Sequence, residues 1–197
     1  MKLLLVRHGQ SEWNAQGRWQ GQADPPLTEL GRRQARMAAQ SLGSFDAIIA
    51  SPLLRASETA AIISAQMGVG PVVTVDDLKE RDAGEWSGLT RSDIEEQYPD
   101  YLKSGKRPPA YELDEEMLPR VRGALTQIID TIQADSVLVV CHGGVVYALE
   151  EELGEQWKRL TNLGGRWIEC SDGRFSLGER AKLIDDKLSS SQPTDIF

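Results

Sequence analysis

The sequence contains only two histidines, and each comes directly after a short, mostly apolar segment. His8 follows residues 3–7 (LLLVR), and His142 follows residues 137–141 (VLVVC). An apolar run that ends in polar residues predicts a buried strand with functional side chains at its carboxyl end. Open α/β sheets bind ligands at that edge. We therefore expect the two imidazoles to face each other across one site.

Two arginines are expected at the same edge. Arg7 directly precedes His8, and Arg55 lies about one helical turn after Ser51-Pro52, where a hydroxyl cap and a first-turn proline predict a helix start. Arginine binds phosphate oxygens in a bidentate fashion. Backbone N–H groups of a helix starting near Gly143, together with the Asn14 amide, would add donors. This donor set predicts a site for a phosphate dianion, and the acids that follow the third predicted strand supply candidate proton donors: Asp76, Asp77, Glu80, Asp82 and Glu85.

Histidine at such a site can act as a nucleophile. A neutral imidazole attacks phosphorus and becomes a phosphohistidine, while the second histidine stabilises charge on the transferring group. A carboxyl group then protonates the leaving alcohol and later deprotonates the attacking water. A metal site is the natural alternative, but no His-x-x-x-His or paired-cysteine spacing occurs, and the flanking arginines would repel a cation. We expect neither a metal nor another cofactor.

Strands alternate with helices along the chain. Expected strands cover residues 3–6, 45–50, 71–75 and 137–141, and a hairpin covers 166–170 and 174–177 with a turn at Asp172-Gly173. Helices are expected over 29–42, from Ser51 to about 67, over 92–98, from a cap at Asp114 to about 132, and over 144–153; residues 101–111 are expected to be irregular. This order predicts a single α/β domain over residues 1–197, with a mostly parallel sheet, an antiparallel edge and a loose tail from about residue 189.

Composition excludes several partners. The net charge is −8, which disfavours a nucleic-acid surface and means that an anionic substrate has to be held by a local cluster of arginines. No apolar run approaches the ~20 residues that span a bilayer, and the first residues do not resemble a signal peptide. We expect a cytoplasmic protein that does not bind nucleic acid or membranes.

Four segments together resemble the motifs of the histidine phosphatase superfamily, which includes the phosphoglycerate mutases. Each is weak alone, but four in the right order are highly specific. The segments are Leu5–Asn14 (LVRHGQSEWN), Ser51–Ala60 (SPLLRASETA), Leu78–Gly88 (LKERDAGEWSG) and Val140–Gly144 (VCHGG).

The resemblance implies a three-layer α/β/α sandwich of the phosphoglycerate mutase-like type. It also implies roles for individual residues: His8 is phosphorylated, Arg7, Arg55 and His142 bind the phosphoryl group, and Glu80 is the proton donor. Asn14 and Gly143 lie within the first and fourth of these motifs, and the resemblance implies that they also bind the phosphate. The segment 111–116 (YELDEE) departs from the Gly-Glu-Ser stretch of many relatives, so substrate contacts there do not carry over.

The rim of the site is less defined than its centre. Gln20, Gly21 and Arg81 are the main candidates for contacts with the rest of the substrate, and five more residues are either rim or packing residues: Trp13, Trp19, Trp86, Tyr101 and Lys103.

A phosphatase is favoured over a mutase. The stretch between the acid loop and His142 is short, and Gln22 stands where the mutases usually have tryptophan. The predicted reaction is hydrolysis of a small phosphorylated metabolite, such as a sugar phosphate or a phosphoglycerate derivative, with phosphoproteins left open. A phosphoglycerate mutase and a non-catalytic phosphate-binding module are the alternatives. A homodimer is left open, since the strand around Trp167-Ile168 is either an edge that pairs with a partner or core.

Overall fold

The computed structural model describes residues 1–171 and 173–185, and the expected tail from about residue 189 lies outside this part. Six strands of the described chain form one sheet in the order β3-β2-β4-β1-β5-β6. The first four are parallel, and β5 and β6 run antiparallel at one side. The strands are β1 (Lys2–Arg7), β2 (Ala47–Ala50), β3 (Val73–Thr74), β4 (Ser136–Cys141), β5 (Gly164–Ser171) and β6 (Arg174–Lys182).

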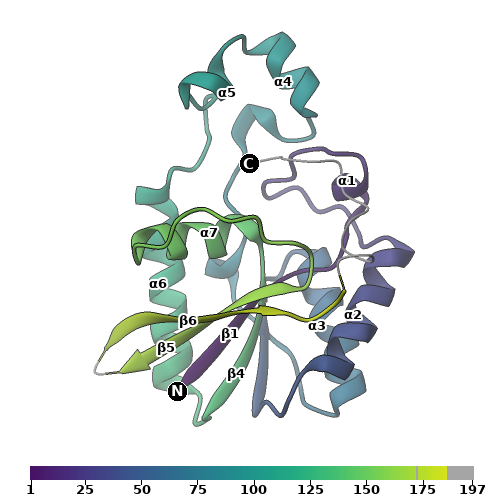
Figure 1. Cartoon of the computed structure of the whole chain (residues 1–197), viewed down its shortest axis with the longest axis vertical. Coiled ribbons are helices and arrows are strands. Elements are labelled where there is room, and N and C mark those ends of the chain that lie inside the picture. Colours follow the sequence, from purple (N-terminus) through teal and green to yellow (C-terminus); the bar gives the residue numbers. More distant parts are fainter. Residues whose placement is uncertain (172, 186–197) are drawn as a thin grey trace.

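Helices cover both faces of this sheet (Figure 1). One face carries α6 (Asp114–Thr131) and α7 (Gly143–Glu152), and the other carries α2 (Glu29–Ser41) and α3 (Leu54–Met67). Three short helices, α1 (Glu12–Ala15), α4 (Arg91–Gln97) and α5 (Tyr101–Ser104), lie in the connections. The predicted three-layer α/β/α fold with an antiparallel edge is therefore confirmed.

The apolar run of β1 is continuous because the strand is buried on both faces. Leu3 and Leu5 pack with α6 and α7, whereas Leu4 and Val6 pack with α2 and α3. The register pairs Arg7 with Cys141 across β1 and β4. His8 and His142 follow these two residues, so the sheet delivers both imidazoles to neighbouring positions at its carboxyl edge.

A small cap stands apart from the sheet. Helices α4 and α5 lie at the top of Figure 1, beyond the carboxyl ends of the parallel strands. Their apolar residues gather around a separate cluster formed by Trp19, Trp86 and Ile94. Trp86 is fully buried there, with its ring 5.0 Å from that of Trp19. The cap therefore has its own aromatic core and lies over the carboxyl edge of the sheet, where the histidines are.

Some local expectations were wrong. The third strand is limited to Val73–Thr74, and the segment 101–111 includes the short helix α5. Helix α6 begins at Asp114 after Leu113, so Asp114 is its first residue and not its cap. For the strand around Trp167-Ile168, an edge and core were both left open, and the structure agrees with core. The strand β5 lies between β1 and β6, and Trp167 stacks on Phe45 with 5.8 Å between ring centroids.

The predicted start of α3 was also wrong. The helix begins at Leu54, and Leu53 at its amino end makes no side-chain cap. The Ser51 hydroxyl accepts from the Leu53 N–H at 3.3 Å and is hydrogen-bonded to Nε2 of His142 at 2.8 Å. A contact with the second histidine therefore replaces the local capping role that the Ser-Pro pair indicates.

Candidate active site

His8 is held in one tautomer. Its Nδ1 donates to the carbonyl of Gly9 at 2.6 Å, and its Nε2 accepts from Nε of Arg55 at 3.2 Å. The ring is 2% exposed. Because Nδ1 keeps its proton, Nε2 is unprotonated and carries the lone pair that an attacking nitrogen requires.

His142 lies beside it. The two ring centroids are 5.3 Å apart with planes inclined at 62°. Its Nε2 is bonded to the Ser51 hydroxyl, while its Nδ1 is buried and has no hydrogen-bond partner among the described residues. An unpaired buried nitrogen is costly. This atom is therefore a candidate contact for a ligand.

The two arginines flank His8 from different elements. Arg55 comes from α3, is fully buried, and donates to the backbone carbonyls of Gly21 and Ala23 at 2.8 and 2.7 Å. Arg7 ends β1 and donates from Nη1 to the carbonyl of Leu160 at 2.7 Å. A guanidinium has five N–H groups, so these bonds fix each fork and leave donors for an anion.

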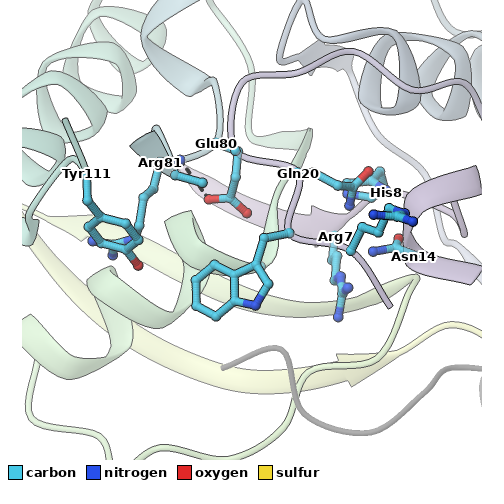
Figure 2. A pocket seen from close by; sticks show the side chains of 12 residues that line it. Arg7, His8, Asn14, Gln20, Glu80, Arg81 and Tyr111 are labelled. Carbon is cyan, nitrogen blue, oxygen red and sulfur yellow. Dashed lines mark hydrogen bonds between the residues drawn. The ribbon is translucent and has the colours of Figure 1, made fainter. Parts of the chain in front are cut away.

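Glu80 is anchored by two backbone N–H groups. Its Oε1 accepts from Arg81 at 2.9 Å, and its Oε2 accepts from Gly144 in the first turn of α7 at 3.0 Å. Figure 2 shows the Glu80 carboxylate among the side chains that line the same pocket as His8. These two hydrogen bonds fix the position of the carboxyl group in the pocket.

Most predicted site residues line one pocket (Figure 2). The predicted members of its lining are Arg7, His8, Asn14, Gln20, Gly21, Glu80, Arg81 and Gly143, joined by Trp19 from the wider rim set. Arg55 and His142 are not part of this lining, but both contact His8, Arg55 through its hydrogen bond to Nε2 and His142 through the neighbouring ring. The Asn14 oxygen accepts from the Ser11 N–H at 3.3 Å, so its amide N–H groups can serve a ligand.

The other rim candidates lie outside this lining. Trp13 packs near Gly88, Trp86 is buried in the cap, and Tyr101 belongs to the aromatic cluster of the cap. The Lys103 side chain is 85% exposed, 3.9 Å from Asp100. These four residues therefore have packing or surface roles in this structure.

Sequence reasoning missed a set of contacts from the loop before β5. Asn162, which is fully buried, donates to the carbonyl of His8 at 2.8 Å, and Leu163 donates its N–H to the carbonyl of Arg7. The Leu160 carbonyl is the acceptor for Arg7 described above. This loop therefore positions both residues, but a lone asparagine far along the sequence gives no signal of it. Tyr111, Arg18 and Ala83 were also missed as lining residues.

Close backbone packing explains why glycine follows His8. A Cβ on Gly9 would lie 2.7 Å from the carbonyl oxygen of Gly31 in α2. The Gly9 N–H also donates to the Thr59 hydroxyl at 3.0 Å. Thr59 in turn donates to the carbonyl of Arg55. The loop after β1 is thus clamped between α2 and α3, which fixes the ring of His8.

The electrostatic environment of the site favours neutral imidazoles. Burial, with Arg55 and Arg7 nearby, lowers the pKa of His8 well below its ordinary value of 6.5. Burial, Arg55 and His8 do the same to the pKa of His142. Burial also lowers the pKa of Arg55 to about 10, which still leaves it charged at neutral pH. The site therefore carries two guanidinium charges and is suited to an anion.

The described part of the chain has neither a cluster of metal-binding side chains nor a helix that could span a membrane. Residues 1–171 and 173–185 contain no group of three or more His, Cys, Asp or Glu side chains placed to hold a metal ion. Within the same residues, no helix has the length and apolar character needed to cross a membrane.

Comparison with known proteins gives consistent matches. Residues 3–179 match the family model of the histidine phosphatase superfamily (branch 1). The uncharacterized phosphatase PhoE of Bacillus subtilis is 38% identical over 182 residues, which cover 89% of this chain and 91% of that protein. The 2,3-bisphosphoglycerate-dependent phosphoglycerate mutase of Methylorubrum extorquens is 38% identical over 161 residues, or 75% and 76% of the two chains. The mycobacterial glucosyl-3-phosphoglycerate phosphatase complexed with VO3 has a TM-score of 0.80 at 28% identity, covering 89% of this chain and 96% of that chain.

Proposed function

Since the chain belongs to the histidine phosphatase superfamily, we propose that it hydrolyses phosphomonoesters through a phosphohistidine on His8. The observation that carries this proposal is the state of His8. Its Nδ1 is committed to the Gly9 carbonyl and its Nε2 lone pair points to Arg55. A bound phosphate would be drawn to the same guanidinium, which brings phosphorus to Nε2.

The reaction proceeds in two steps. In the first, Nε2 of His8 forms a bond to phosphorus as the ester P–O bond breaks, and protonated Glu80 gives its proton to the departing alkoxide oxygen. In the second, Glu80 takes a proton from water, the water oxygen bonds to phosphorus, and the N–P bond breaks. Inorganic phosphate leaves, and both His8 and Glu80 return to their starting forms.

The remaining cations stabilise the transferring group. Arg7 and Arg55 keep free N–H donors for its oxygens, and the Asn14 amide adds another. Burial and Arg55 lower the pKa of His142 and so disfavour its charged form. A bound dianion reverses that balance, so His142 becomes a donor from the otherwise unpaired Nδ1 when substrate is present.

The leaving alcohol belongs to a small phosphorylated metabolite, and phosphatase relatives of known structure support hydrolysis over transfer. A mutase is the second candidate because one relative at 38% identity is a phosphoglycerate mutase. The cap here is built from only two short helices, α4 and α5. We therefore favour water as the second acceptor.

Steady-state hydrolysis of p-nitrophenyl phosphate tests the proposal. We expect turnover by the wild type, unchanged in EDTA, and a loss of at least about 10⁴-fold in His8→Asn because the nucleophile is gone. Lack of turnover by the wild type across a panel of phosphomonoesters would contradict the proposal. With 3-phosphoglycerate and 2,3-bisphosphoglycerate, isomerisation faster than phosphate release would favour the mutase.

A further inference from the structure

A second, larger hollow opens next to the phosphoryl pocket. It shares Trp19, Arg81 and Tyr111 with that pocket. Its other walls come from the cap, from the start of α6, from α7 and from Trp157 in the segment after α7. Figure 2 shows Tyr111 and Arg81 at the end of the pocket away from His8, with Glu80 between. The hollow, here called the side groove, therefore begins on the far side of the proton donor, where an alcohol would emerge.

The phosphoryl pocket and the side groove differ in size, which suits them to different parts of a substrate. The phosphoryl pocket offers about 40 Å³ and the side groove about 470 Å³. The smaller space admits a small group such as a phosphoryl group. The larger one lies in the range of sites that enclose whole small molecules. An alcohol much longer than three carbons thus has room only in the side groove.

Arg107 is the cation of the side groove that has no acidic partner. Arg81, in the same wall, is paired with Asp114. Arg107 lies over the rings of Tyr111 and Trp86, at 5.3 and 5.7 Å from their centroids. Among the described residues, its one hydrogen bond is a 3.4 Å contact to the Lys106 carbonyl. Within the described chain, no carboxylate lies at ion-pair distance from it.

The two aromatic rings hold the Arg107 guanidinium in place and leave the N–H groups at its edge available to a ligand. Two aromatic faces restrict the plane of Arg107, which lowers the entropy lost when it binds. The planar fork suits a carboxylate or a second phosphate. Because the whole chain has a net charge of −8, such a local cation is needed to hold an anion at this end.

We infer that the side groove is a leaving-group subsite for phosphomonoesters whose alcohol is longer than three carbons and carries a second anionic group, which Arg107 binds. This inference rests on the proposed phosphatase function. The phosphoryl group lies at His8, the chain of the alcohol passes Glu80 and Tyr111, and its distal anion meets Arg107.

Two matched six-carbon substrates test the inference. 6-Phosphogluconate and sorbitol 6-phosphate have the same chain and the same primary leaving oxygen but differ in the distal carboxylate. We expect kcat/KM of the wild type to be roughly tenfold higher for 6-phosphogluconate, as expected for one charge-assisted hydrogen bond at a partly exposed site. The kcat/KM for 6-phosphogluconate should also exceed the kcat/KM for glycerol 3-phosphate, whose alcohol is too short to reach the side groove.

Arg107→Gln should remove the preference by lowering kcat/KM for 6-phosphogluconate about tenfold while leaving sorbitol 6-phosphate within about twofold. Lys106→Gln is the control, since it removes the same charge from the neighbouring residue, which does not line the side groove. Equal losses on both substrates, no loss, or the same effect in the control would overturn the inference while leaving phosphatase activity established. Failure of the wild type to turn over even p-nitrophenyl phosphate would instead refute the proposed function, and the inference with it.

Discussion

Replacing Gly144 by alanine tests whether Glu80 is the proton donor. A Cβ at this position would lie 2.3 Å from Oε1 and 3.1 Å from Cδ of Glu80. Ordinary van der Waals contact requires the carboxylate to retreat by roughly 1 Å. Glu80 is a flexible side chain and alanine favours the helix by about 1 kcal/mol, so the free energy of unfolding should change by no more than about 1 kcal/mol.

The effect on catalysis should depend on the leaving group. A general acid contributes about 10²- to 10⁴-fold, and a misplacement of about 1 Å can cost about 10²-fold. We therefore expect Gly144→Ala to lower kcat/KM for an alkyl phosphate about 100-fold. p-Nitrophenolate leaves without a proton, so kcat/KM for p-nitrophenyl phosphate should fall about tenfold or less.

The assay compares kcat/KM, which reports the phosphorylation step, for glycerol 3-phosphate and p-nitrophenyl phosphate. Gly123→Ala is the matched control, because it makes the same change within helix α6 and its added Cβ would have no neighbour within 4 Å. It should leave both values unchanged. If Gly144→Ala kept full activity toward the alkyl phosphate, or lost activity equally on both substrates, the assignment of Glu80 as acid would be wrong.

Two other predictions follow from the buried contacts. Asn162→Ala removes the hydrogen bond to the His8 carbonyl. We expect the free energy of unfolding, measured by urea denaturation, to fall by about 1–3 kcal/mol, and kcat to fall about tenfold or more. No change in either quantity would show that the loop does not position His8. Burial and Arg55 lower the pKa of His8 in the folded protein. Below pH 6.5 the unfolded chain therefore binds a proton at His8 that the folded chain does not bind. The stability that is present above pH 6.5 is lost as the pH falls. His8→Asn should therefore flatten the decline in unfolding free energy between pH 6.5 and 5 by about 1 kcal/mol per pH unit; an unchanged slope would contradict the depressed pKa.

Short-range sequence patterns predicted much of the fold and the centre of the site. The apolar runs before His8 and His142 predicted two buried strands, and parallel pairing of β1 with β4 brings their ends together. Helix α2, from Glu29 to Ser41, begins after the predicted cap at Thr28, whose hydroxyl accepts from Gly31. These features depend on neighbouring residues, which is why a single sequence contains them.

Long-range contacts were not predictable in the same way. The Leu160 carbonyl meets Arg7 across 153 residues of chain, and Asn162 meets His8 across 154. Neither position has a local pattern, because a carbonyl is common to all residues and asparagine is common in loops. Ser51 shows the reverse case, in which a clear capping signal gave the wrong helix start because its hydroxyl is bonded to His142.

The most direct test of the central claim is to trap the phosphorylated protein and locate the modified atom. Brief reaction with a ³²P-labelled phosphomonoester, denaturation in alkali and peptide mass spectrometry should give one acid-labile label on His8, attached to Nε2 because Nδ1 is held by the Gly9 carbonyl. The two phosphohistidine isomers separate by chromatography. A label on His142, a label on Nδ1 of His8, or phosphate release with no labelled protein would contradict the account.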